Sequence, residues 1–144
     1  MSKIFLIIPG RCMPKERPRF NMKTGTVYTP KKTLDYESIV KANAAMNIGK
    51  PLEGAVEISV IVEQKIPKSW SKKKKLAVLN GEEVVTSVQD LDNMLKSVTD
   101  GLNKIAYKDD RQIVKIVAEK RYSETDQVIV VIKEIENANS DKKK

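Results

Sequence analysis

Residues 90–104 read Asp-Leu-Asp-Asn-Met-Leu-Lys-Ser-Val-Thr-Asp-Gly-Leu-Asn-Lys, and they form the clearest helical pattern in the chain. The apolar side chains recur at i, i+3, i+4, i+7 and i+11, which makes one continuous stripe: Leu91, Met94, Leu95, Val98 and Leu102. At about 100° per residue, a polar group gathers on the opposite side: Asp92, Lys96, Thr99, Asp100 and Asn103. The stretch predicts an amphipathic helix that packs on a core and presents acidic side chains outward.

Extended segments flank this helix on both sides in the sequence. The apolar run Lys3–Pro9 ends at a Pro-Gly pair, and residues 55–63 alternate between apolar and polar side chains. After the helix, residues 112–122 and 127–135 are both rich in Val and Ile, and a short polar turn separates them. We therefore expect four strands, the last two of them paired as a hairpin.

The remaining segments predict two more helices and a long loop. Residues 11–30 are basic and proline-rich without any period, which indicates a loop with a small hairpin near Gly25. From Pro30 to about Ile48 the pattern is helical, and its expected apolar stripe is Leu34, Ile39, Val40 and Ala44. Ser69 or Ser71 is suited to cap a short helix.

This order of elements predicts an α+β fold, with helices packed on a mixed β-sheet. A chain of 144 residues is long enough for one core, so we expect a single domain over residues 1–136. Residues 137–144 are polar and are expected to form a disordered tail.

Composition excludes several kinds of catalytic site. The chain has no histidine and one cysteine, Cys12, so it contains no histidine-based nucleophile, no internal disulfide and no cysteine–histidine zinc site. Catalysis would have to use carboxylates, lysines, hydroxyls or a metal held by oxygen.

The net charge is +8, and the first fifty residues contribute +7 of it, with ten basic and three acidic side chains. This balance favours a polyanionic partner, nucleic acid first. No apolar run is long enough to span a membrane, so we expect a soluble, cytoplasmic protein without a membrane partner.

The acidic residues allow two interpretations. In the simpler one, Asp90 or Asp92 caps the helix, Lys96 pairs with Asp92, and Asp109-Asp110 makes a turn. Taken together, however, they form a dense group of oxygen ligands, which suits Mg²⁺ or Mn²⁺. A basic protein that concentrates acids at one place is suited to metal-assisted phosphodiester chemistry.

Three segments carry a family resemblance: Asp90-Leu-Asp-Asn-Met-Leu-Lys96, Asp100-Gly-Leu-Asn103 and Tyr107-Lys-Asp-Asp-Arg-Gln-Ile113. They resemble the signature of the RusA-type Holliday junction resolvases, dimeric endonucleases of DNA recombination and repair that are associated with phages and prophages. The likeness extends to Arg17–Phe20, to Val27–Lys32 and to Pro67–Lys75, so it covers roughly residues 5–122.

The resemblance implies a site and a mechanism. Asp90, Asp92 and Asp110 would be catalytic metal ligands, with Asp109 as an alternative to Asp110, and Lys96 would be the catalytic lysine. The cofactor would be Mg²⁺, with Mn²⁺ as a substitute. An activated water would cut the strand and leave a 5′-phosphate and a 3′-hydroxyl. A homodimer would place two symmetric nicks in a four-way junction.

The basic segments are expected to contact DNA phosphates. The residues in this prediction are Lys15, Arg17, Arg19, Lys23, Lys31, Lys32, Lys72, Lys73, Lys74 and Lys75. Phe20 and Tyr28 lie among these charges and are suited either to stacking at a junction centre or to the core.

Two other classes of protein fit the same sequence. One is a protein that binds branched DNA and has weak or general nuclease activity. The other is a basic scaffold or RNA-binding module, in which the acids only cap helices. The complete acidic set argues against the first of these, and a cleavage assay on a four-way junction with and without Mg²⁺ would separate all three classes.

Overall fold

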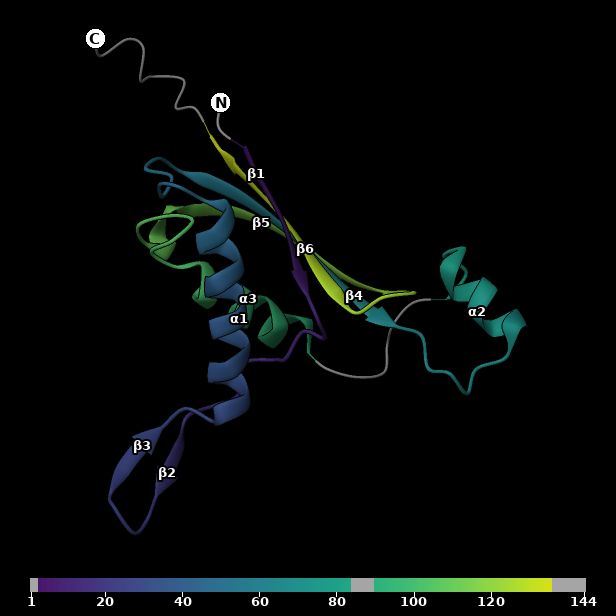
Figure 1. Ribbon diagram of the computed structural model, residues 1–144, viewed down its shortest axis with the longest axis horizontal. Coiled ribbons are helices and arrows are strands. Elements are labelled where there is room, and N and C mark those ends of the chain that lie inside the picture. The colour runs from purple at the N-terminus through teal and green to yellow at the C-terminus, as the bar shows by residue number, and fades with distance from the viewer. Residues whose placement is uncertain (1–2, 84–89, 136–144) are drawn as a thin grey trace.

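Four strands form one mixed sheet in the structure, a computed structural model that describes residues 3–83 and 90–135. They are β1 (Lys3–Pro9), β4 (Val56–Lys65), β5 (Ile113–Ser123) and β6 (Gln127–Glu134). Their order across the sheet is β1-β6-β4-β5 (Figure 1). β6 is antiparallel to both of its neighbours, whereas β4 and β5 are parallel. The sheet is therefore mixed, and the α+β prediction is confirmed.

The predicted hairpin between the last two strands is wrong. β5 and β6 follow each other in the chain, but β4 lies between them and pairs with both. Ser59 of β4, for example, is opposite Val117 of β5 on one side and Val131 of β6 on the other. The apolar row of β4 is fully buried at Ile58 and Val60, so this strand occupies the centre of the sheet. A β5–β6 hairpin would have pushed it to an edge.

Two helices cover one face of this sheet (Figure 1). They are α1 (Lys31–Asn47) and α3 (Leu91–Leu102), and they pack against each other as well as on the strands. The stripe predicted for α3 is confirmed at its centre, because Met94, Val98 and Leu102 are buried. Leu91 and Leu95 are half-buried at its border.

The buried face of α1 differs from the predicted stripe. Val40 and Ala44 are buried as expected, but Leu34 and Ile39 are 48% and 46% exposed. The side chains that face the core there include Thr33 and two longer ones, Tyr36 and Glu37. The period was recognised correctly, but the phase was wrong because polar side chains occupy part of the buried face.

Two small elements project from this body at different places (Figure 1). The strands β2 (Arg19–Asn21) and β3 (Thr26–Tyr28) form the expected hairpin, which extends beyond the start of α1. The helix α2 (Lys72–Leu79) follows Ser71, whose side chain accepts a hydrogen bond from the Lys74 backbone and confirms one of the two predicted caps. The 137–144 tail lies outside the described residues. No helix in the described part is both long and apolar enough to cross a membrane.

Gly101 allows α1 and α3 to approach closely. A Cβ atom at this position would lie 2.7 Å from both Cβ and Cγ1 of Val40, and 3.2 Å from the Glu37 carbonyl oxygen. Val40 is fully buried, so its side chain has no free space to move into. The absence of a side chain at residue 101 therefore sets the spacing of the two helices.

We predict that Gly101→Ala destabilises the protein. Helix propensity alone would favour alanine by about 1 kcal/mol, but the contact with Val40 is expected to reverse the sign and cost about 1–3 kcal/mol. Urea unfolding followed by circular dichroism measures the change. In a Val40→Ala background the same substitution should cost less, because one clashing methyl is gone. A Gly101→Ala protein more stable than the wild type would contradict the close contact.

Candidate active site

Helix α3 presents the first acidic residues of the site. Asp90 is its N-cap residue by backbone position, yet its side chain makes no capping hydrogen bond and instead accepts one from the Asn93 amide at 3.3 Å. Asp92 and Lys96 lie on the exposed side of the helix, one turn apart. This is the orientation that the amphipathic pattern predicts, because the apolar stripe holds the other side against the core.

A hollow of about 260 Å³ lies between α3 and the start of β5. It is lined by Asp92, Leu95, Lys96, Thr99, Asp110, Ile113 and Ile116. Two carboxylates and one ammonium group thus border the same space, and Leu95, Ile113 and Ile116 add an apolar wall. These apolar residues were not anticipated, since they look like ordinary core positions in the sequence.

The turn before β5 separates the roles of Asp109 and Asp110. Asp109 caps the 3₁₀ turn η1 (Asp110–Gln112): its Oδ1 accepts from the Arg111 backbone at 2.8 Å and from Arg111 Nε at 3.3 Å. The hydrogen bond from the Arg111 backbone, together with the Arg111 charge, lowers the pKa of Asp109. Asp110 is exposed and faces the hollow. Asp109 therefore stabilises the turn, whereas the Asp110 carboxylate borders the hollow.

Gln112 fixes this turn and was missed by the sequence analysis. Its side-chain oxygen accepts from the backbone of Lys108 at 2.7 Å and of Asp109 at 2.9 Å, and its amide donates to the carbonyl oxygens of Leu52 and Gly54 at 2.8 Å. The spacing Asp-x-x-Gln is a capping-box pattern, so the signal was present in the sequence. It anchors the Asp109-Asp110 turn to the segment before β4.

Asp100, on the last turn of α3, joins two lysines. It lies 3.5 Å from Lys96 Nζ and 3.2 Å from Lys15 Nζ, while Lys15 also pairs with Glu37 of α1. The simpler interpretation expected Lys96 to pair with Asp92, but its partner is Asp100. Asp92 therefore faces the hollow without this ion pair.

Tyr107 lies in the segment between α3 and the turn before β5. Its ring is fully buried, and its hydroxyl donates to the Thr99 carbonyl oxygen at 2.7 Å. Burial, and then the negative charges of Asp110 and Asp100, raise the pKa of this phenol. It stays a neutral donor that ties the segment after α3 back to the helix.

The predicted site residues are brought together only in part. Asp92, Lys96 and Asp110 border one hollow, whereas Asp90 is not among its lining residues. Within residues 3–83 and 90–135, no three acidic or cysteine side chains are grouped closely enough to hold a metal ion.

Comparison with known proteins identifies the family. A model of the family described as endodeoxyribonuclease RusA matches residues 9–133, which is most of the chain. The chain belongs to the RusA endodeoxyribonuclease family. A relative from Bacillus subtilis (strain 168), described as uncharacterized protein YqaN, is 34% identical over 140 residues and covers 94% of this chain and 99% of its own. The resemblance found in the sequence is thus confirmed, and the family's activity is DNA cleavage.

Most of the basic residues expected at the DNA interface of this RusA-family chain are exposed. Arg17, Arg19 and Lys23 lie on or beside the β2–β3 hairpin, and Lys31 and Lys32 begin α1. Tyr28 and Phe20 of the hairpin are also exposed, at 46% and 61%, which excludes the core alternative for both. The run Lys72–Lys75 lies on α2, where Lys74 sits over the Trp70 ring at 4.0 Å.

Lys15 differs from the other basic residues. Burial alone would lower its pKa, but hydrogen bonds to Glu37 and Asp100 outweigh that effect, and the pKa is raised. Its side chain is 22% exposed. The ammonium group of Lys15 has two carboxylate partners, Glu37 and Asp100, so it links the basic loop to α1 and α3.

We predict that the two adjacent aspartates respond differently to mutation. Asp109→Ala removes a cap and should lower the thermal unfolding temperature by a few degrees at pH 7, whereas Asp110→Ala should leave it unchanged or raise it slightly. Because the pKa of Asp109 is lowered by folding, its contribution is present above the ordinary carboxyl range and is lost as the pH falls through the folded-state pKa. Calorimetry at pH 7 and at pH 3 measures both variants. Equal losses for the two variants would contradict the assigned roles.

Proposed function

We propose that this chain is a Mg²⁺-dependent endonuclease that resolves four-way DNA junctions by paired symmetric nicks. The observation that carries the proposal is the hollow that brings Asp92, Asp110 and Lys96 together in a chain of the RusA family. The absence of histidine is consistent with it, because two carboxylates and a metal can replace an imidazole base.

The residues of the hollow fit a magnesium ion. Mg²⁺ prefers oxygen ligands, keeps several waters, and is commonly bound through one or two carboxylates plus substrate phosphates. Asp92 and Asp110 provide such a pair, and Mn²⁺ accepts the same ligands. Asp90, two residues before Asp92, is proposed as a third carboxylate on the strength of the family resemblance. When bound, the metal would lower the pKa of a water and offset phosphate charge.

The protein side chains then have separate roles in the reaction. Water adds to the scissile phosphorus, the bond to the 3′ oxygen breaks, and the products carry a 5′-phosphate and a 3′-hydroxyl. Lys96 stabilises the charge that develops on the phosphate or on the leaving oxygen. Asp100 holds the Lys96 ammonium near the hollow, and the apolar wall reduces access of other water molecules.

DNA binding would use the two projections of the molecule. The β2–β3 hairpin carries Arg19 and Lys23 at one place, with Arg17 just before it, and α2 carries the Lys72–Lys75 run at another (Figure 1). Phosphate contacts at both would position branched DNA across the hollow without reading its sequence. Phe20, exposed on the hairpin, is suited to stack on bases at the junction centre.

A second copy of the chain is required for paired nicks, and the open face of the sheet is suited to bind it. On the face opposite α1 and α3, the central rows contain Phe5 and Ile7 of β1 and Val117 of β5, which are 60%, 46% and 52% exposed. The register places Ile129 and Val131 of β6 between them.

Ionic side chains border this apolar area at both ends. Glu57 pairs with Lys115 at 3.1 Å at one end, and Glu63 pairs with Arg121 at 2.9 Å at the other. An apolar centre with a charged rim is typical of a protein–protein interface. We propose that this sheet face forms the homodimer.

The alternative function is binding of branched DNA with weak or general cleavage. Its support is that the described residues contain no group of three acids arranged for a metal. A labelled four-way junction with and without Mg²⁺ separates the two: we expect paired nicks that disappear with EDTA and return with Mn²⁺. Equal cleavage of linear duplex would favour a general nuclease.

We predict that Asp92→Asn and Asp110→Asn each lower junction cleavage in Mg²⁺ by about 10²-fold or more, because each removes a metal ligand beside the scissile phosphate. Junction binding measured without metal should change little. Asp109→Asn is the matched control and should retain most of the activity. Asp90→Asn tests the third ligand separately. Full cleavage by Asp92→Asn would refute the site.

We also predict that Phe5→Glu/Ile7→Glu converts the dimer to a monomer, because it places four charges per dimer in the apolar centre of the interface. Light scattering after size exclusion measures the mass. The matched control is Leu34→Glu/Ile39→Glu on α1, where the two side chains have similar exposure. The monomer should nick a junction without resolving it. A wild-type protein that is already monomeric would sink the proposal.

A further inference from the structure

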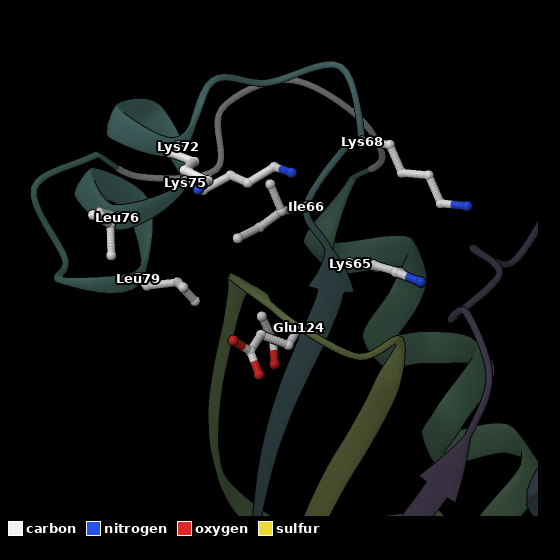
Figure 2. Close-up of a pocket in the computed structure, with 9 residues that line it drawn as sticks. Lys65, Ile66, Lys68, Lys72, Lys75, Leu76, Leu79 and Glu124 are labelled. Atoms are coloured by element: carbon white, nitrogen blue, oxygen red, sulfur yellow. The ribbon is translucent and has the colours of Figure 1, made fainter.

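A second hollow lies at the far end of the sheet from the candidate active site. It has a volume of about 420 Å³, and its lining comes from α2, the end of β4 and the turn between β5 and β6 (Figure 2). The lining residues are Lys65, Ile66, Lys68, Lys72, Lys75, Leu76, Leu79, Ser123 and Glu124. From Ile116, which borders the active-site hollow, to Ser123 is seven residues of β5, or about 23 Å along the strand.

The floor of this pocket is aliphatic. Leu76 and Leu79 are 60% and 43% exposed although they lie on an eight-residue helix, and Ile66 is the buried residue between them and the sheet. The helix is held instead by Val78 and Trp70, which pack with Ile66 and Tyr122 in a small core of their own. The two leucines are therefore not needed to attach α2, and they leave apolar surface open.

The rim of the pocket is positively charged. Four lysines belong to its lining, against one acid, Glu124: Lys72 and Lys75 lie on α2, and Lys65 and Lys68 lie on the other side with their side chains extending away from α2 (Figure 2). None of the four ammonium groups is in an ion pair with a carboxylate of the described residues. An occupant must therefore combine an apolar body with negative charges around it.

The chemistry of the lining favours a peptide over a nucleic acid. An unpaired base binds best on an aromatic face, but the nearby aromatic rings do not line the pocket: Trp70 and Tyr122 pack edge to face, 4.8 Å apart. Aliphatic floors and lysine rims match Leu or Phe side chains flanked by Asp or Glu.

We propose that this pocket is a docking site for an acidic peptide segment that carries large apolar side chains, contributed by a partner protein. Such docking would attach the nuclease to its partner through α2 and would leave the active-site hollow free. Lys72 and Lys75 belong both to this rim and to the proposed DNA interface, so the peptide and DNA are expected to compete for α2.

The test uses fluorescence polarisation with the full-length protein and a fluorescein-labelled peptide Glu-Asp-Leu-Phe-Asp-Glu. We expect saturable binding that is lost when Leu-Phe is replaced by Gly-Ser or when the acids are replaced by lysines. Leu76→Ser/Leu79→Ser should weaken binding about tenfold or more. The control Leu34→Ser/Ile39→Ser, with side chains of similar exposure on α1, should bind as the wild type does.

Two further measurements make the outcome decisive. Circular dichroism checks that the pocket variant is folded, and junction cleavage without peptide should be unchanged in it, which separates this proposal from the proposed nuclease function. Absence of peptide binding up to about millimolar concentration overturns the proposal, as does equal binding to the pocket variant. Tighter binding of labelled oligothymidine, lost in the same variant, would instead identify single-stranded DNA as the occupant.

Discussion

The parallel pairing of β4 with β5 is the constraint on which the candidate site depends. Parallel neighbours cannot be joined by a tight turn, so the chain must leave the end of β4 and return to the opposite end of the sheet before β5 begins. This crossover, from Lys65 to Ile113, carries α2, α3 and the 3₁₀ turn. Asp92 lies on α3 and Asp110 lies in the 3₁₀ turn at the end of the crossover. Both border the same hollow, which lies between α3 and the start of β5.

The surroundings of the hollow show how contacts with neighbouring residues hold the turn and the helix that border it. The Gln112 side chain anchors the turn to the segment before β4, and the Asp109 side chain caps the same turn. Neither of these contacts uses the side chain of Asp110. On the helix side, Asp100 holds Lys96 and is itself held by Lys15. Charged side chains with ion-pair or capping partners thus surround Asp92 and Asp110, and these pairings show how a dense charge cluster is compatible with a stable fold.

The elements with the strongest periodicity were predicted correctly, and the errors have physical causes. The α3 stripe and the alternation in β4 are dictated by burial on one side, so each pattern indicates its structure directly. The phase of α1 was missed because Thr33 and Glu37 are buried there. The β5–β6 hairpin was predicted wrongly because a short connection between two strands favours their pairing, whereas β4 is inserted between them and pairs with both.

The sequence by itself determined the kind of chemistry: a chain without histidine, with carboxylates at a spacing that resembles the RusA family and positive charge concentrated in its first fifty residues. Only the tertiary structure decided which acids share a space. In the tertiary structure Asp109 caps a turn, whereas Asp110 borders the hollow. Lys15 forms ion pairs with Glu37 and Asp100, and three segments that are distant in the sequence form the lysine-rimmed pocket. The physical reason is that residue type and local period are properties of short segments, whereas the choice between adjacent side chains depends on hydrogen bonds to residues more than fifty positions away.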